Sequence, residues 1–130
     1  MLSPFLYLYQ EKEEEEIMTD EIMKVINDNL GNPDLNVEMI ATEVGISRVH
    51  LHRKLKELTN QSTRDLIRNV RLKQAASLLA NQYHNITEVA TLTGFTNIAY
   101  FSTAFKELYG VPPTTYMEEQ QKSSSDEIKQ

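Results

Sequence analysis

Six side chains that can carry positive charge are concentrated in one short segment, "SRVHLHRKLK" at residues 47–56. The chain around them is acidic, with a formal net charge of −6 over 130 residues. Between Ser47 and Lys73 there are eight basic residues and two acidic ones, which gives a local net charge of +6. A basic patch on an acidic protein is the electrostatic pattern of a surface that docks a polyanion. Arginine and lysine also favour exposed helix, so charge alone leaves both interpretations open.

The spacing of this segment indicates which of its side chains share one face of a helix. Leu51, Leu55 and Leu58 recur at helical spacing and are expected to face the core. The sequence therefore predicts that the opposite face points outward as one largely basic stripe. Its members, at i, i+3, i+4 and i+7, are Val49, His52, Arg53 and Lys56.

The same residue types are poorly placed for catalysis or metal binding. His50 and His52 are two positions apart, so on a helix they point about 200° apart and cannot share a metal. The chain has no cysteine, no glycine-rich phosphate loop and no histidine–carboxylate pair at catalytic spacing. We therefore expect no enzymatic activity, no cofactor and no metal. A helical protein–protein adaptor remains the alternative to a nucleic-acid binder, although an adaptor would more naturally expose apolar residues on this face.

The elements that carry these residues are all expected to be helices. Hydrophobic residues recur at helical spacing along nearly the whole chain, and no run alternates as a half-buried strand would. A first helix should begin near Thr19 and stop at Gly31 and Pro33. Ser62 and Asp65 have the spacing of a capping box at the start of a long helix. Further helices are expected to follow the N-cap residues Asn36, Ser47, Asn85 and Thr96.

An internal repeat relates "VEMIATEVGIS" (37–47) to "ITEVATLTGFT" (86–96). In each copy a small alanine lets two helices cross closely, a glycine permits a left-handed turn, and Ser or Thr caps the next helix. This is the pattern of a helix-turn-helix, whose second helix is presented to the major groove of DNA. Two copies of this pattern joined by a long helix indicate helix-turn-helix units far more specifically than one copy does. The aligned pairs are Ala41 with Ala90, Gly45 with Gly94 and Ser47 with Thr96 at an offset of 49, then Leu51 with Phe101, Leu55 with Phe105 and Leu58 with Leu108 at an offset of 50.

Four stretches carry a resemblance to a known family: "VGISRVHLHRKLKEL", "IRNVRLKQAASLL", "ITEVATLTGF" and "AYFSTAFKELYGVPPTTY". Over residues 20–117 the sequence resembles the DNA-binding domain of the AraC/XylS family of bacterial transcription regulators. The resemblance implies an all-α fold of about seven helices, with two helix-turn-helix subdomains joined by a long linking helix. The run "SRVHLHRKLKELTNQS", followed by "LIRNVRLKQAA", is similar to the C-terminal domain of hybrid two-component regulators.

The sequence divides into an extension or linker at 1–16, the DNA-binding domain at 17–118, and a tail at 119–130. The extension begins with an apolar run, "MLSPFLYLYQ", that is too short to span a bilayer. As a whole, "MLSPFLYLYQEKEEEE" could be a linker, a docking helix or an artificial boundary. The tail has too little apolar surface to fold, so we expect it to be disordered. Within the domain, the first helix-turn-helix is expected at about 36–59, the linking helix at about 63–80, and the second helix-turn-helix at about 85–109.

In the first unit, Val49, His52 and Arg53 match the positions that contact base edges in the family. A guanidinium can bind O6 and N7 of guanine together, an imidazole can donate or accept, and a valine can contact the thymine methyl. Arg48 and Lys56 are expected to meet phosphates, which position a protein on DNA without reading its sequence.

In the second unit, the corresponding outward face is expected to contact bases through Ile98, Ala99, Ser102 and Thr103, and phosphates through Asn97 and Lys106. Thr103 stands where many members of the family carry an arginine, so the first unit should supply most of the base specificity. Met117 is another departure from a common arginine. Phe101 and Phe105 are expected in the core rather than stacked on bases.

On the linking helix, Arg64, Arg68, Arg71 and Lys73 cannot all be assigned to DNA, and some are expected to pair with Asp65 or Glu88. The expected partner is double-stranded DNA. The resemblance further implies RNA polymerase and a sensor or receiver domain outside this chain as partners, a cytoplasmic location, and no contact with a membrane.

Overall fold

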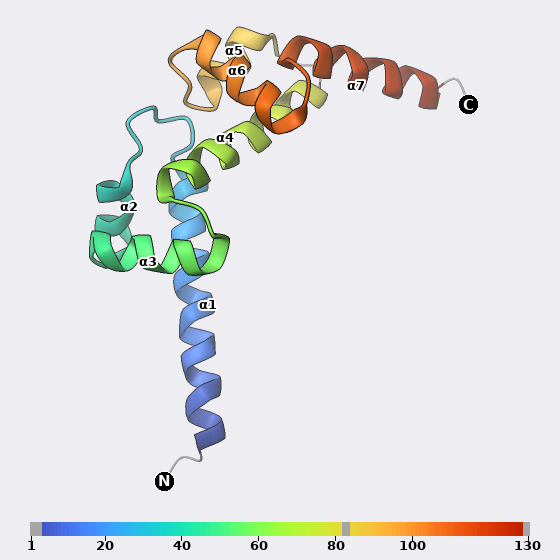
Figure 1. Cartoon of the computed structure of the whole chain (residues 1–130). Coiled ribbons are helices and arrows are strands. Elements are labelled where there is room, and N and C mark those ends of the chain that lie inside the picture. The colour runs from blue at the N-terminus through green and yellow to red at the C-terminus, as the bar shows by residue number, and fades with distance from the viewer. Residues whose placement is uncertain (1–3, 82–83, 129–130) are drawn as a thin grey trace.

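The computed structural model of the chain describes residues 4–81 and 84–128, and its regular structure there is entirely helical (Figure 1). The all-α prediction is confirmed, and the linking helix lies where the sequence places it. Figure 1 shows this helix running diagonally between two helical groups, one on either end. The helices are α1 (Pro4–Asp28), α2 (Val37–Val44), α3 (Arg48–Thr59), α4 (Thr63–Ala80), α5 (Ile86–Leu92), α6 (Ile98–Tyr109) and α7 (Pro113–Ile128).

Most helices begin at the residue whose side chain caps them. Ser47 Oγ accepts from the backbone N–H of His50 at 3.1 Å, and Asn36, Ser62 and Asn85 make the same bond to the third residue beyond them. Such a cap stabilises a helix by about 1 kcal/mol because it satisfies an amide that has no partner in the first turn. The four predicted caps are therefore confirmed.

The predicted cap of α6 is wrong by one residue. Its N-cap is Asn97, whose Oδ1 accepts from the N–H of Tyr100 at 3.0 Å, and not Thr96. The extra residue of the second unit therefore lies before the cap, in the turn after Gly94. An asparagine amide oxygen caps as well as a hydroxyl, so local chemistry alone did not separate the two positions.

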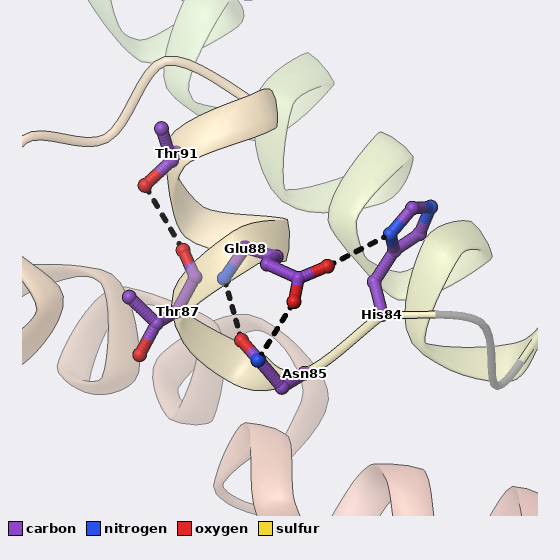
Figure 2. A network of polar contacts seen from close by, with 5 residues as sticks. All are labelled: His84, Asn85, Thr87, Glu88 and Thr91. Carbon is purple, nitrogen blue, oxygen red and sulfur yellow. Dashed lines mark hydrogen bonds and ion pairs between the residues drawn. The ribbon is translucent and has the colours of Figure 1, made fainter.

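Figure 2 shows how the start of α5 is organised around Glu88. Its backbone N–H donates to Asn85 Oδ1 at 2.8 Å, and its carboxylate accepts from Asn85 Nδ2 at 2.8 Å. The other carboxylate oxygen lies 3.2 Å from His84 Nδ1. Glu88 is thus engaged within its own segment, and of the two acids named as possible partners for the arginines of α4 it is not the one that pairs.

Two hydrophobic cores share the linking helix. Leu66 and Ile67, near its start, pack with α1, α2 and α3, whereas Leu72 and Leu79, further along, pack with α5, α6 and α7. Each fully buried side chain of this kind contributes roughly 1.5–3 kcal/mol. Because one continuous helix supplies a wall to both cores, the two helix-turn-helix units are held at a fixed separation.

The repeat extends further than the sequence comparison indicated. Residues 51–65 and 101–115 have the same succession of buried, half-buried and exposed positions at an offset of 50. At equivalent positions, Asn60 (φ 55°) and Gly110 (φ 82°) both end their helices in the left-handed conformation. The junction of α6 with α7 therefore repeats the junction of α3 with α4.

The N-terminal region differs from the prediction of a helix that begins near Thr19. Helix α1 starts at Pro4 and includes most of the expected extension, and Figure 1 shows it projecting well beyond α2 and α3. Glutamate and lysine favour helix, and proline is tolerated in the first turn. Residues 1–3 lie outside the described residues.

The predicted disordered tail is helical as far as Ile128. Tyr116 and Met117 anchor the earlier part of α7 against the second core. Once such a helix is nucleated by packing, each further residue adds a backbone hydrogen bond, so a polar continuation can stay helical.

The prediction that Leu58 faces the core is wrong, since this residue is 49% exposed, and its repeat equivalent Leu108 is 43% exposed. They occupy the same place in the two units, in the last turn of α3 and of α6. Leu58 lies beside polar residues of α1, including Glu15 and Thr19, and Leu108 beside Arg68 of α4. Both leucines thus lie at the edge of their cores and not inside them.

Candidate nucleic-acid interface

The first unit is built on the turn between α2 and α3. Gly45 has a φ of 81°, a conformation that strains any residue with a Cβ, and its N–H donates to Ala41 O at 2.9 Å. Ser47 then starts α3. This turn sets the direction in which the recognition helix leaves the core.

The outward stripe of α3 lies on the surface as the spacing predicts. Val49 is 73% exposed, and Arg53 and Lys56 are also exposed. An isolated apolar side chain of this kind beside two cations can contact a thymine methyl while the cations meet bases or phosphates. The face has the composition of a major-groove reading helix, and its individual DNA contacts stay predictions.

His52 is held in position by the linking helix. Its Nδ1 lies 3.2 Å from the hydroxyl oxygen of Thr63, which is fully buried at the start of α4. This bond orients the ring and leaves Nε2 as the nitrogen available for an outward contact. A half-buried histidine oriented in this way loses little side-chain entropy when it meets a ligand.

Arg48 is engaged with an acid in the free protein. Its guanidinium lies 2.9 Å from Glu38 Oε1, and both side chains are more than 60% exposed. Exposed pairs of this kind contribute at most about 1 kcal/mol, so a phosphate can displace the carboxylate. The predicted phosphate contact is compatible with this pair.

One lysine of the basic segment points inward, which the sequence did not indicate. Lys54 is 8% exposed, and its Nζ lies 3.5 Å from Glu15 Oε1 of α1. Its position one residue from the leucine stripe was the available signal, since a lysine stem can cover apolar surface. Lys54 therefore belongs to the packing of α1 on α3 and not to the outward face.

The second unit turns at Gly94, where space is much tighter. Its φ is 88°, and a Cβ there would lie 2.3 Å from Leu30 O and 2.9 Å from Arg71 Nε. Only glycine lets the turn approach the end of α1 and the linking helix this closely.

The outward face of α6 is weakly polar. Ile98, Ala99 and Thr103 are exposed and Ser102 is half-buried. The hydroxyl of Thr103 donates to Ala99 O of its own helix at 3.0 Å, which reduces its capacity to read bases. Lys106 is the single basic residue of α6. The face lies at the surface, as predicted, and carries little positive charge.

The aromatic residues of α6 belong to the core, as predicted. Phe101 and Phe105 are fully buried, with ring centroids 5.9 Å apart. Phe105 also packs edge-on against Tyr116 of α7. These rings hold α6 in place and are not available to stack on bases.

The arginines of the linking helix have distinct environments. Arg68 lies 3.5 Å from Asp65 Oδ1, so the predicted pairing with this acid is confirmed. Arg71 Nη2 donates to Asn32 O at 2.8 Å, and burial lowers the pKa of its guanidinium below the ordinary value. Arg71 thereby ties the loop before α2 to α4, beside the turn at Gly94.

Within residues 4–81 and 84–128, no helix is both long and apolar enough to cross a membrane. Among residues 14–81 and 84–123, whose side chains the structure describes, no group of three or more His, Asp or Glu side chains is arranged to hold a metal ion.

Comparison with known proteins places this geometry in a family. A family model described as a helix-turn-helix domain matches residues 40–119. The chain is 32% identical over 102 residues to histidine kinase P4 of Formosa agariphila, covering 78% of this chain and 7% of that protein. It is 29% identical over 116 residues to the Msm operon regulatory protein of Streptococcus mutans, covering 89% of this chain and 41% of that one. The chain therefore spans less than half the length of these two relatives.

Two solved structures share the fold over most of their own length. A DNA-binding transcriptional dual regulator from Escherichia coli K-12 superposes with a TM-score of 0.73 at 30% identity, covering 81% of this chain and 93% of that one. The C-terminal domain of AraT, a response regulator from Geobacillus stearothermophilus, gives 0.72 at 31% identity, covering 78% and 84%. With its two helix-turn-helix units on one linking helix and a family model over most of its length, the chain belongs to the AraC-type helix-turn-helix family.

Proposed function

We propose that this chain binds double-stranded DNA sequence-specifically, with α3 and α6 in successive major grooves, and thereby regulates transcription. The observation that carries the proposal is that α3 and α6 each follow a glycine turn and expose one face to solvent. One helix, α4, holds the two faces relative to each other. The exposed cations of α3, which are Arg48, Arg53 and Lys56, supply attraction to phosphates. The DNA-binding regulator of similar structure supports the same function.

We assign unequal roles to the two units. The first reads bases through Val49, His52 and Arg53, with Arg48 and Lys56 on phosphates. The second offers Ile98, Ala99, Ser102 and Thr103 to bases, with Asn97 and Lys106 on phosphates. Because the second face has no long side chain that can bind a base through two hydrogen bonds, its contribution to specificity is the smaller one.

Selection of duplexes from a random DNA library by the purified chain, at near-physiological salt, tests this function. We expect a motif with one strongly specified half and one degenerate half, with centres about 10 base pairs apart. Failure to enrich any motif, together with salt-insensitive binding to a protein partner, would instead support a helical adaptor.

We further propose that the chain is the output domain of a larger cytoplasmic regulator that also contacts RNA polymerase. The kinase relative and the response-regulator structure support a sensor or receiver domain elsewhere in the same polypeptide. An antibody against this domain should then detect, in the native cell, a polypeptide much larger than 15.0 kDa. A band at that mass alone would contradict the proposal.

A further inference from the structure

A hollow of about 230 Å³ lies between the linking helix and the start of the second recognition helix. Three guanidinium groups line it from α4, at the i, i+4 and i+7 positions that share one helix face. Among the described residues, none of those that line the hollow is acidic. These residues are Pro33, Arg64, Arg68, Arg71, Gly94, Phe95, Thr96, Asn97 and Tyr100.

The positive charge in this hollow is only partly neutralised. Arg64 is exposed, and Arg68 meets Asp65 at 3.5 Å in a half-exposed pair that contributes little. Arg71 Nη2 donates to a neutral carbonyl, while its Nε is buried and has no hydrogen-bond partner among the described residues. A buried donor of this kind costs about 1–3 kcal/mol if it stays unpaired. The hollow therefore favours an anion.

The hollow adjoins the surface that we assign to DNA. Its wall includes Asn97, the cap of α6 and a predicted phosphate contact. A water molecule takes about 30 Å³ of liquid, so the space can admit a hydrated phosphate group. A phosphate that contacts Asn97 from outside would lie at the mouth of the arginine cluster.

The hollows beside α3 and α6 differ in the charge of the residues that line them. A hollow beside α3 is lined by Glu14, Glu15 and Met18 of α1 together with His50 and Lys54 of α3. Helix α3 carries its own cations, whereas α6 carries only Lys106. The hollow beside α3 thus combines carboxylates with the cation of Lys54, whereas the hollow beside α6 is lined by three arginines and, among the described residues, by no acid.

We propose that Arg64, Arg68 and Arg71 form a phosphate-binding hollow for the DNA backbone between the two major-groove contacts. The hollow supplies the second unit with the cationic contacts that α6 lacks. The inference rests on the proposed function, because it assumes that α3 and α6 face one duplex. It adds the linking helix to the DNA-binding surface.

The first experiment measures the salt dependence of binding to a duplex recovered by selection. The double variant Arg64→Ala, Arg68→Ala should bind DNA at least tenfold more weakly at low salt. The negative slope of the logarithm of the association constant against the logarithm of the salt concentration should become shallower by about 1. The base preferences should not change, because phosphates carry no sequence information. Arg71 is left intact, since its bond to Asn32 joins two parts of the fold.

Lys73→Ala is the matched control. It removes one positive charge from an exposed position on the opposite face of α4, about 180° from Arg64. Affinity and slope should stay within twofold of the unsubstituted chain. An equal loss in this variant, or no loss in the double variant with an unchanged melting temperature, would overturn the inference.

A second experiment locates the phosphate. Each linkage between the two half-sites is replaced in turn by a neutral methylphosphonate. We expect one or two positions to weaken binding of the unsubstituted chain and to have no further effect on the double variant. Equal effects on both proteins would refute the hollow as the binding site.

Two further outcomes would overturn the inference, and each can be told apart from the results above. If the unsubstituted chain selects no duplex at all, the proposed function itself fails, and the inference fails with it. If added inorganic phosphate raises the melting temperature of the unsubstituted chain and not of the double variant, while no methylphosphonate position matters, the hollow binds a free anion and the DNA-backbone inference is overturned.

Discussion

Arg53 and Lys56 lie on the same exposed face of α3, but their chemistry differs. A guanidinium can bind a guanine edge through two hydrogen bonds, whereas a lysine near the helix end acts as a point charge. We expect Arg53→Ala to relax the preference at one base position, by about 1–3 kcal/mol, with little change in salt dependence. Lys56→Ala should weaken binding to all sequences alike and reduce the salt slope by about one. Titrations on a set of single-base variants would show whether these two roles are reversed.

Gly45 and Gly94 provide a matched pair for the energetics of the two turns. Both have a positive φ, but a Cβ at Gly45 meets nothing within 4 Å, whereas at Gly94 it collides with the backbone of Leu30. Gly45→Ala should therefore cost only the left-handed strain, about 1–2 kcal/mol. Gly94→Ala should cost distinctly more, because the turn must also move away from α1. Urea unfolding of both variants tests this difference, and equal losses would contradict the close approach.

At the scale of elements, the linking helix determines whether the two units act together. Its 18 residues span about 27 Å and contribute to both cores. Gln74 is exposed in its middle, so Gln74→Gly should lower the free energy of unfolding by about 1 kcal/mol relative to Gln74→Ala. We also expect the glycine variant to lose more affinity for a duplex with both half-sites than for one with the first half alone. Equal losses on both duplexes would indicate that the helix does not act as a rigid spacer.

At the scale of the whole molecule, two recognition helices on one rigid frame require a fixed spacing in the DNA. Successive major-groove faces lie about 34 Å apart along one side of the duplex. Insertion of five base pairs between the half-sites turns the second half to the opposite side. Affinity should then fall to that of a duplex with the first half alone, as measured by competition. An unchanged affinity would show that the second unit does not contact DNA in register.

The local features of this protein could be predicted from sequence because they depend on residues near one another in the chain. The caps at Asn36, Ser47, Ser62 and Asn85, and the outward stripe of α3, follow from periodicity and hydrogen bonding within a few residues. The cap of α6 was missed by one position, since Thr96 and Asn97 are equally capable and only the length of the turn separates them.

What the sequence by itself determined is the all-α class, the duplicated helix-turn-helix and the identity of the basic stripe, because these rest on short-range patterns. Tertiary structure alone decided that Lys54 turns inward to Glu15 and that Leu58 and Leu108 stay half-exposed. It also decided that three arginines of α4 line one hollow together with Asn97. Helical periodicity shows which residues share a face, but the partner of that face lies far away in the chain. Its packing depends on the summed burial of all the helices, which no local pattern contains.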